Sequence, residues 1–239
     1  MKAEKILALK EGEVHLWASH LKNHLSYLDS ALLLLSAEEK ERAAHFIKKE
    51  DSHDFILSHG ILRNILSRYV EIAPEKINFI KTAYGKPSLE DSLLRFNMSH
   101  TQEIALYGVT WHREIGIDVE FISRSVEVEG LAKRFFSSDD YHRLMRLPLS
   151  ARKEAFFCAW VRKEAYLKAQ GQGLSGGLDQ CDVSLHLGES EGLLKLEGSE
   201  ESARLWTVPA FAYEKKYRMA FAVQGKVKSV KYFRWELSE

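Results

Sequence analysis

Two carboxylates lie two positions apart in segment 116–120, which reads Gly-Ile-Asp-Val-Glu. Because side chains alternate between the faces of a β-strand, Asp118 and Glu120 would share one face while Ile117 and Val119 point to the core. Carboxylates this close repel each other unless a cation lies between them. Oxygen ligands on a rigid strand suit Mg²⁺ or Mn²⁺ better than zinc. The segment predicts a divalent-cation site, and a solvated strand face bearing two acids is the alternative.

A second group recurs at helical spacing. Trp160, Glu164 and Lys168 are four residues apart, so they would share one face of a helix. Glu164 can supply a third carboxylate to the same cation, and Lys168, one turn further on, can face a phosphate oxygen. A surface Glu–Lys pair beside a core tryptophan is the alternative reading.

A third group can bind an anion. Gly85 and Pro87 predict a tight turn that presents Lys86, and Ser99 and His100 follow a short predicted strand. A lysine, a hydroxyl and an imidazole are suitable partners for a phosphate. No G-x-S-x-G segment surrounds Ser99, which disfavours a hydrolase triad. An ordinary turn and a loop histidine remain the alternative for either piece alone.

The elements that must position these groups are indicated by periodicity and capping. Ser36 and Glu39 form a predicted capping box that opens a helix to about residue 49, and Gly171 stands where a glycine would end a helix. The other predicted helices cover 53–70, 127–135, 138–147 and 150–170. The predicted strands cover 14–17, 77–81, 95–98, 104–110, 115–121, 181–187, 192–197, 203–208, 218–223 and 230–235.

This order of elements predicts an α+β fold with a pseudo-twofold duplication. The polar residues 112–114 mark the predicted boundary between an N-terminal half, 1–112, and a C-terminal half, 113–239. Each half would combine a layer of helices with a short sheet.

Composition excludes several classes of partner. The 34 Lys and Arg residues balance the 34 Asp and Glu residues, so no global charge predicts binding to nucleic acid or to an anionic membrane. The only cysteines, Cys158 and Cys181, form no metal-binding or disulfide pattern. The sequence has no apolar run of membrane-spanning length, and residues 1–13 do not resemble a signal peptide. We expect a cytoplasmic protein.

Taken together and in order, the motifs resemble those of the Sfp-type 4′-phosphopantetheinyl transferases. The resemblance runs from about residue 36 to 187. The matching segments are 85–87, 96–100, 116–120, 132–137 and 160–174.

The resemblance implies a pseudo-twofold α+β monomer that binds coenzyme A between its halves. It assigns Mg²⁺ to three carboxylates and the coenzyme A phosphates to nearby basic and polar residues. Arg63 also fits the family pattern, whereas Glu39 stands where the family often has a basic residue. Val161 departs from the small or hydroxyl residue usual in the family. The implied ligands are Asp118, Glu120 and Glu164 for Mg²⁺, Lys86, Ser99 and His100 for phosphates, Lys168 near the pyrophosphate, and the group Lys40, Arg42, Lys48 and Lys49 as candidates for the 3′-phosphate.

The implied reaction moves the phosphopantetheine arm of coenzyme A to a serine of an acyl, polyketide or peptidyl carrier protein and releases 3′,5′-ADP. Glu164 is the predicted general base for the serine proton, and Lys168 would stabilise the leaving phosphate. Residues 171–179 and the pair Phe135 and Phe136 are candidate docking points for the carrier.

Two other functions compete with this one. A Mg²⁺-dependent hydrolase of coenzyme A or nucleotide pyrophosphates would use the same metal with activated water. A non-catalytic carrier-binding module would not require Asp118, Glu120 or Glu164. Cleavage of coenzyme A without a carrier, or carrier binding without transfer, would distinguish them.

Overall fold

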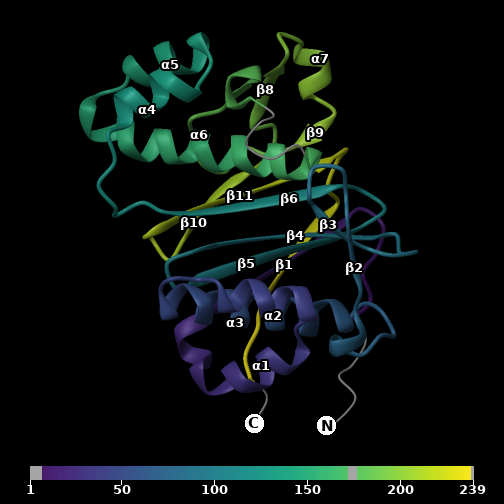
Figure 1. Cartoon of the computed structure of the whole chain (residues 1–239). Coiled ribbons are helices and arrows are strands. Elements are labelled where there is room, and N and C mark those ends of the chain that lie inside the picture. The colour runs from purple at the N-terminus through teal and green to yellow at the C-terminus, as the bar shows by residue number, and fades with distance from the viewer. Residues whose placement is uncertain (1–6, 172–176, 238–239) are drawn as a thin grey trace.

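Two β-sheets lie face to face between two layers of helices in the computed structural model, which describes residues 7–171 and 177–237 (Figure 1). The sheet of the first half has the strand order β12-β1-β5-β4, and that of the second half has the order β10-β11-β6, with β9 also paired to β11. Strands of the first sheet are β1 Glu13–His20, β4 Leu94–Thr101, β5 Ile104–Trp111 and β12 Ser229–Arg234. Strands of the second are β6 Ile115–Phe121, β9 Trp206–Thr207, β10 Ala210–Tyr213 and β11 Tyr217–Gln224.

Helices cover the outer face of each sheet (Figure 1). Helix α3 Lys49–Ser67 covers the first sheet, and α1 Leu28–Leu34 and α2 Ala37–Ala44 pack against α3. Helix α6 Leu149–Gln170 covers the second sheet, and α4 Val128–Phe135 and α5 Ser138–Met145 pack against α6. A third apolar core lies between the two sheets, where Leu16 and Leu106 of the first sheet meet Ile117 and Phe221 of the second. Burial on both faces of each sheet explains why its strands are rich in apolar residues.

Smaller elements complete the fold. These are the hairpin of β2 Phe79–Lys81 and β3 Pro87–Leu89, the hairpin of β7 Cys181–Val183 and β8 Leu193–Leu196, and the short helix α7 Glu200–Ala203. Turns of 3₁₀-helix cover Leu21–Tyr27, Pro74–Lys76 and Leu178–Gln180.

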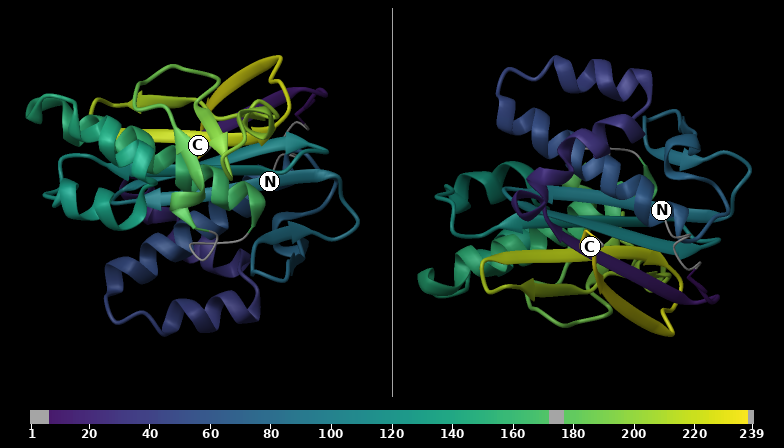
Figure 2. Two further views of the ribbon diagram at one scale, coloured as in Figure 1. Left: turned by 90° about the horizontal axis from the view of Figure 1, so that it is seen from above. Right: turned by 90° about the horizontal axis from the view of Figure 1, so that it is seen from below.

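The two halves repeat one topology, which confirms the predicted α+β fold with internal duplication. The first half runs β1, α3, β4, β5 and the second runs β6, α6, β10, β11. In both, the last strand lies between the other two and is antiparallel to each. The C-terminal strand β12 then pairs in parallel with β1, so it completes the sheet of the first half (Figure 2). The boundary at 112/113 stays a prediction.

Local sequence signals are confirmed where capping decides the structure. Glu39 N–H donates to Ser36 Oγ and Ser36 N–H donates to Glu39 Oε2, the reciprocal pair of a capping box. The helix it opens ends at Ala44, earlier than predicted, and the next one begins at Lys49. Gly171 ends α6 with φ of +72°, a backbone conformation that glycine adopts at little cost.

Three sequence expectations were wrong or incomplete. The strand predicted over 203–208 is only Trp206–Thr207, because Ser199 caps helix α7 by accepting a hydrogen bond from Ser202 N–H. The strand predicted over 181–187 ends at Val183. Elements α1, β3, α7 and β10 were not predicted, since elements this short carry little periodicity.

In the part of the chain that the structure describes, no helix combines the length and apolar character needed to cross a membrane.

Candidate functional site

Strand β6 directs its two acids toward helix α6. Ile117 and Val119 are buried between the sheets, which confirms the alternation predicted for this strand. Gly116 lies on the opposite face with Asp118 and Glu120, and a Cβ atom there would stand 2.0 Å from the carbonyl oxygen of Ala165. The missing side chain therefore lets the backbone of α6 lie directly against β6.

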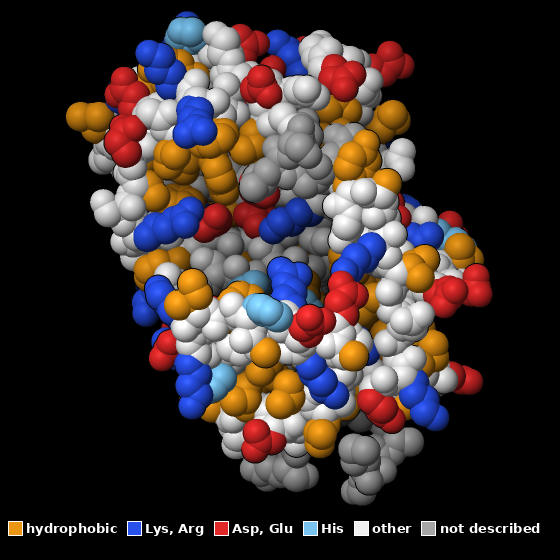
Figure 3. Space-filling view, viewed as in Figure 1, with side chains coloured by type: hydrophobic (Ala, Val, Ile, Leu, Met, Phe, Trp, Pro, Cys, Tyr) orange, Lys and Arg blue, Asp and Glu red, His pale blue; other side chains and the backbone are white. Residues whose placement is uncertain are grey.

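This close contact brings the helix residues to the strand residues. One cavity of about 410 Å³ contains the predicted metal ligands together with part of the predicted phosphate site. Figure 3 shows acidic, basic and histidine side chains gathering in the hollow band between the two layers of helices. The predicted residues that line the cavity are Ser99, His100, Asp118, Glu120, Glu164 and Lys168.

Asp118, Ser99 and Lys168 form a triangle of hydrogen bonds. Lys168 Nζ donates to Asp118 Oδ1 over 2.6 Å and to Ser99 Oγ over 3.0 Å, and Ser99 Oγ donates to the same carboxylate oxygen over 3.0 Å. The second oxygen, Asp118 Oδ2, is buried with no hydrogen-bond partner. A buried carboxylate oxygen without a donor is costly unless a cation or donor reaches it.

The three carboxylates repel one another. Burial, followed by the charge of Asp118, raises the pKa of Glu164 to about 7, while Lys168 opposes this rise. Burial and the charge of Asp118 also raise the pKa of Glu120, against the effect of Arg124 and of a hydrogen bond with Trp160. This mutual repulsion is what a bound divalent cation would relieve.

The carboxylates share the cavity without converging on one point. Within residues 7–171 and 177–237, no three Asp, Glu, His or Cys side chains are grouped as a ready-made metal-ligand set. Instead, Lys168 pairs with Asp118, and Arg124 pairs with Glu120 over 3.0 Å. The hard oxygen donors and the partnerless Asp118 Oδ2 fit Mg²⁺, but the ligand roles of the three acids stay predictions.

Asn97 joins the two halves beside this cavity. Its Oδ1 atom accepts a hydrogen bond from Ile117 N–H over 2.9 Å, which links β4 to β6 although the two strands belong to different sheets. Ser99, two residues further along the same face of β4, reaches Asp118. The Asn-Met-Ser segment was noted in the sequence, but no role for Asn97 was predicted, because its partner lies in another strand.

The predicted 3′-phosphate residues lie outside the cavity lining. Lys40 and Arg42 are exposed on α2, and the Arg42 guanidinium lies 5.1 Å from the centre of the Phe55 ring. Desolvation, followed by the charges of Lys168 and Arg42, lowers the pKa of His100, even though His100 is exposed at the surface. His100 is thus close enough to both Lys168 and Arg42 to be affected by their charges.

Lys86 does not line the cavity either. Its Nζ atom donates to Glu114 over 2.6 Å and to the carbonyl oxygens of Ile115 and Ala169 over 3.0 and 2.9 Å. Burial lowers its pKa. Lys86 therefore ties the β2–β3 hairpin to the start of β6 and the end of α6, and its contact with a phosphate stays a prediction.

Arg63 has a structural role in this structure. Its guanidinium is 2% exposed, pairs with Glu39 over 2.6 Å and donates to the carbonyl oxygens of Pro74 and Ile77. The acid at position 39, which departs from the family pattern, is thus the partner of Arg63 and holds α2 against α3.

His59 was missed by sequence reasoning. Its ring stacks on Phe55 at 3.8 Å, and its Nδ1 atom donates to the carbonyl oxygen of Phe55. Burial is the main reason that its pKa falls to about 4, and the charges of Arg42 and His100 lower it further. A neutral histidine therefore lies near the predicted phosphate residues, but no spacing in the sequence indicates it.

The candidate docking points differ in exposure. Phe136 is buried and stacks on Phe156, so it belongs to the core. Phe135 is partly exposed and meets Trp160 edge-on at 5.8 Å. Residues 172–176 of the other candidate segment lie outside the described residues.

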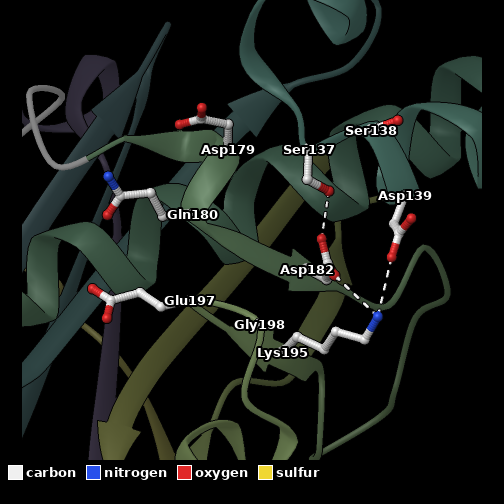
Figure 4. A pocket seen from close by; sticks show the side chains of 9 residues that line it. All are labelled: Ser137, Ser138, Asp139, Asp179, Gln180, Asp182, Lys195, Glu197 and Gly198. Atoms are coloured by element: carbon white, nitrogen blue, oxygen red, sulfur yellow. Dashed lines mark hydrogen bonds and ion pairs between the residues drawn. The ribbon is translucent and has the colours of Figure 1, made fainter.

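A second hollow of about 520 Å³ lies in the C-terminal half and contains none of the predicted catalytic, metal-binding or coenzyme A-binding residues (Figure 4). Its only lysine, Lys195, pairs with Asp139 over 3.0 Å and lies 3.9 Å from Asp182. Ser137 caps α5 by accepting a hydrogen bond from Asp140 N–H, and it donates to Asp182. These side chains satisfy one another, which is typical of a structural cluster.

Comparisons with known proteins agree on one family. Residues 114–222 match the model of the 4′-phosphopantetheinyl transferase superfamily, and residues 19–109 match the model "4′-phosphopantetheinyl transferase, N-terminal". The 4′-phosphopantetheinyl transferase HetI of Nostoc is 38% identical over 86% of this chain and 83% of its own length. The 4′-phosphopantetheinyl transferase Sfp of Bacillus subtilis is 30% identical over 78% of this chain and 80% of its own length. The chain therefore belongs to the 4′-phosphopantetheinyl transferase superfamily.

Proposed function

We propose that the cavity between β6 and α6 is the active site in which this chain, a 4′-phosphopantetheinyl transferase by family, transfers the phosphopantetheine arm of coenzyme A to a serine of a carrier protein. The observation that carries the proposal is the meeting of three carboxylates with Lys168, Ser99 and His100 in one cavity. Acids can hold a metal there, and the basic and polar groups can hold phosphates.

Asp118, Glu120 and Glu164 are the proposed ligands of Mg²⁺. The raised pKa values of Glu120 and Glu164, together with the partnerless Asp118 Oδ2, favour a cation at this position. When bound, Mg²⁺ would neutralise charge on the pyrophosphate oxygens of coenzyme A. Because Lys168 pairs with Asp118 in this structure, it is already placed beside the proposed position of the phosphates.

The proposed reaction needs one proton acceptor. The serine oxygen of the carrier attacks the phosphorus that bears the pantetheine arm, and the bond to the leaving 3′,5′-ADP breaks. Glu164 takes the serine proton, directly or through water, because it would lie beside both the metal and the attacking oxygen. Lys168 donates hydrogen bonds to the leaving phosphate as a point charge.

Binding of coenzyme A is assigned to residues of both halves. Ser99 and His100 would contact the pyrophosphate, since they line the cavity with Lys168. Lys40 and Arg42 on α2 would contact the 3′-phosphate, and the charges of both Arg42 and Lys168 act on His100. Lys86 would have to give up its contact with Glu114 to reach a phosphate.

Intact-mass spectrometry of an apo carrier protein tests this proposal. The carrier is incubated with the protein, coenzyme A and Mg²⁺, and in parallel with EDTA or with the Glu164→Ala variant. We expect a mass increase of one phosphopantetheine group that is lost in both controls. Coenzyme A cleavage without a carrier adduct would instead support the hydrolase function, which the family match does not favour.

Three further parts of the proposal need separate tests. These are the class of carrier that is preferred, the preference for Mg²⁺ over Mn²⁺, and the monomeric state. Rates on fatty-acid, polyketide and peptidyl carriers would rank the partners. Light scattering coupled to size-exclusion chromatography would give the mass in solution, for which we expect that of one chain, 27.5 kDa.

A further inference from the structure

Arg124 lies at the mouth of the carboxylate cavity. It belongs to the segment between β6 and α4, and its guanidinium pairs with Glu120 Oε2 over 3.0 Å. The same group lies 5.4 Å from the centre of the Phe157 ring, and 43% of its side chain is exposed. Neither the sequence motifs nor the function proposed above uses Arg124.

The cavity therefore contains a cation for each of the two acids on β6. Lys168, from α6, pairs with Asp118, while Arg124 pairs with Glu120. With all five groups ionised, three carboxylates face two basic side chains, so only one net negative charge remains to attract a metal ion.

A divalent cation that uses Glu120 must compete with this guanidinium. An arginine has no lone pair to offer a metal, and it stays protonated at any pH at which the protein is folded. Its positive charge also opposes the approach of a second cation to the cavity. A metal that binds Glu120 through Oε2, the oxygen held by Arg124, displaces the guanidinium from it, and the exposed mouth gives the side chain room to swing into solvent.

We infer that Arg124 is a built-in competitor of the divalent cation: it neutralises Glu120 in the metal-free protein and thereby sets the metal affinity of the transferase. The inference rests on the proposed function, because it assumes that Glu120 is a metal ligand. It assigns Arg124 a positioning and affinity role rather than contact with the reacting atoms.

Direct binding of Mn²⁺ measures this role without turnover. Free Mn²⁺ is followed by electron paramagnetic resonance while the purified full chain is titrated with the metal alone. The variants are Arg124→Gln, which removes the charge, and Arg124→Lys, which keeps it. A matched control is Arg134→Gln, because Arg134 also lies over an aromatic ring, Phe135, at 4.9 Å but does not line the carboxylate cavity.

We expect Arg124→Gln to lower the Mn²⁺ dissociation constant about three- to tenfold, the range that loss of a partly exposed ion pair and of one repulsive charge predicts. Arg124→Lys and Arg134→Gln should stay within about twofold of the unaltered protein. An equal or larger dissociation constant for Arg124→Gln, or no detectable binding in any variant, would overturn the inference.

Asp118→Asn separates this inference from the proposed function. If Asp118→Asn loses Mn²⁺ while Arg124→Gln binds as the unaltered protein does, the metal site stands and only the competition by Arg124 is wrong. If Asp118→Asn binds Mn²⁺ normally, the metal lies elsewhere and the proposed function loses its metal site as well. Thermal melting of each variant checks that a lost signal is not a lost fold.

Discussion

Helices α3 and α6 occupy equivalent places in the two halves, but they use their charged residues differently. On α3, the buried Arg63 is fully engaged with Glu39 and two backbone carbonyls, so its charge holds elements together. On α6, Glu164 and Lys168 face the cavity between the halves, and Glu164 has a pKa of about 7.

The comparison teaches that burial of charge alone does not mark the site. α6 also carries Lys163, which is fully buried, pairs with Asp140 over 2.6 Å and donates to the carbonyl oxygen of Leu178. That lysine is as structural as Arg63. What distinguishes the site is a set of like charges placed together with an unsatisfied oxygen, which costs stability unless a ligand compensates for it.

The largest expected effect is on the rate of phosphopantetheine transfer. Asp118→Ala should lower the transfer rate by about 10³-fold or more, because it removes the central acid of the cavity, whereas the fold should persist. Carrier mass spectrometry gives the rate and thermal melting gives the stability. A rate within tenfold of the unaltered protein would contradict the role of Asp118.

Removing the buried charge of Arg63 on α3 should lower the stability of the protein rather than the transfer rate. Arg63→Ala leaves Glu39 and two carbonyls without their donor, so we expect the free energy of unfolding to fall by about 3 kcal/mol. The transfer rate per folded molecule should stay within about threefold. Urea unfolding measures the first value, with the exposed Lys76→Ala as the control that should change little. A large loss of rate without loss of stability would mean that α3 takes part in the chemistry.

The contact between β6 and α6 can be broken at one position. Gly116→Ala places a methyl group 2.0 Å from a backbone oxygen, so α6 must shift, and we expect about 2 kcal/mol of destabilisation together with a clear loss of transfer. In Gly108→Ala the added methyl group meets mainly the end of the Ile115 side chain, which can move, so this control should be milder. Equal effects of the two substitutions would argue against the close packing of α6 as the feature that positions the site.

The smallest expected effect is on the pH dependence of stability. The pKa of Glu164 is about 7 in the folded protein, against an ordinary value of 4.5. Between pH 4.5 and about 7, Glu164 is therefore protonated in the folded state and ionised in the unfolded state. Its contribution therefore makes the protein less stable as pH rises from about 4.5 to 7. In EDTA, Glu164→Gln should be more stable than the unaltered protein by about 1–2 kcal/mol at pH 8 and by little near pH 4.5. The same difference at both pH values would show that ionisation of Glu164 is not the cause.

The sequence predicts those parts of the site that depend on short-range periodicity. Alternation along β6 placed Asp118 and Glu120 on one face, and a spacing of four placed Glu164 and Lys168 on one helix face. The capping residues Ser36 and Gly171 likewise act within one turn of their own helix.

Features that depend on tertiary contacts were not predictable in this way. Lys86 was expected at a phosphate, but its contacts with Glu114 and Ala169 depend on how the halves meet. The partners of Arg63 and Arg124, and the return of β12 to the first sheet, also arise from the assembled fold. No local pattern encodes a partner that lies in another element.

The most direct test of the account is the position of the metal. Crystals grown with coenzyme A and Mn²⁺ would locate the ion by anomalous diffraction. The account predicts a peak about 2.0–2.3 Å from carboxylate oxygens of Asp118, Glu120 and Glu164, with Arg124 no longer paired to Glu120. A metal peak away from these three residues, or a Glu120 still paired with Arg124 beside a bound ion, would contradict it.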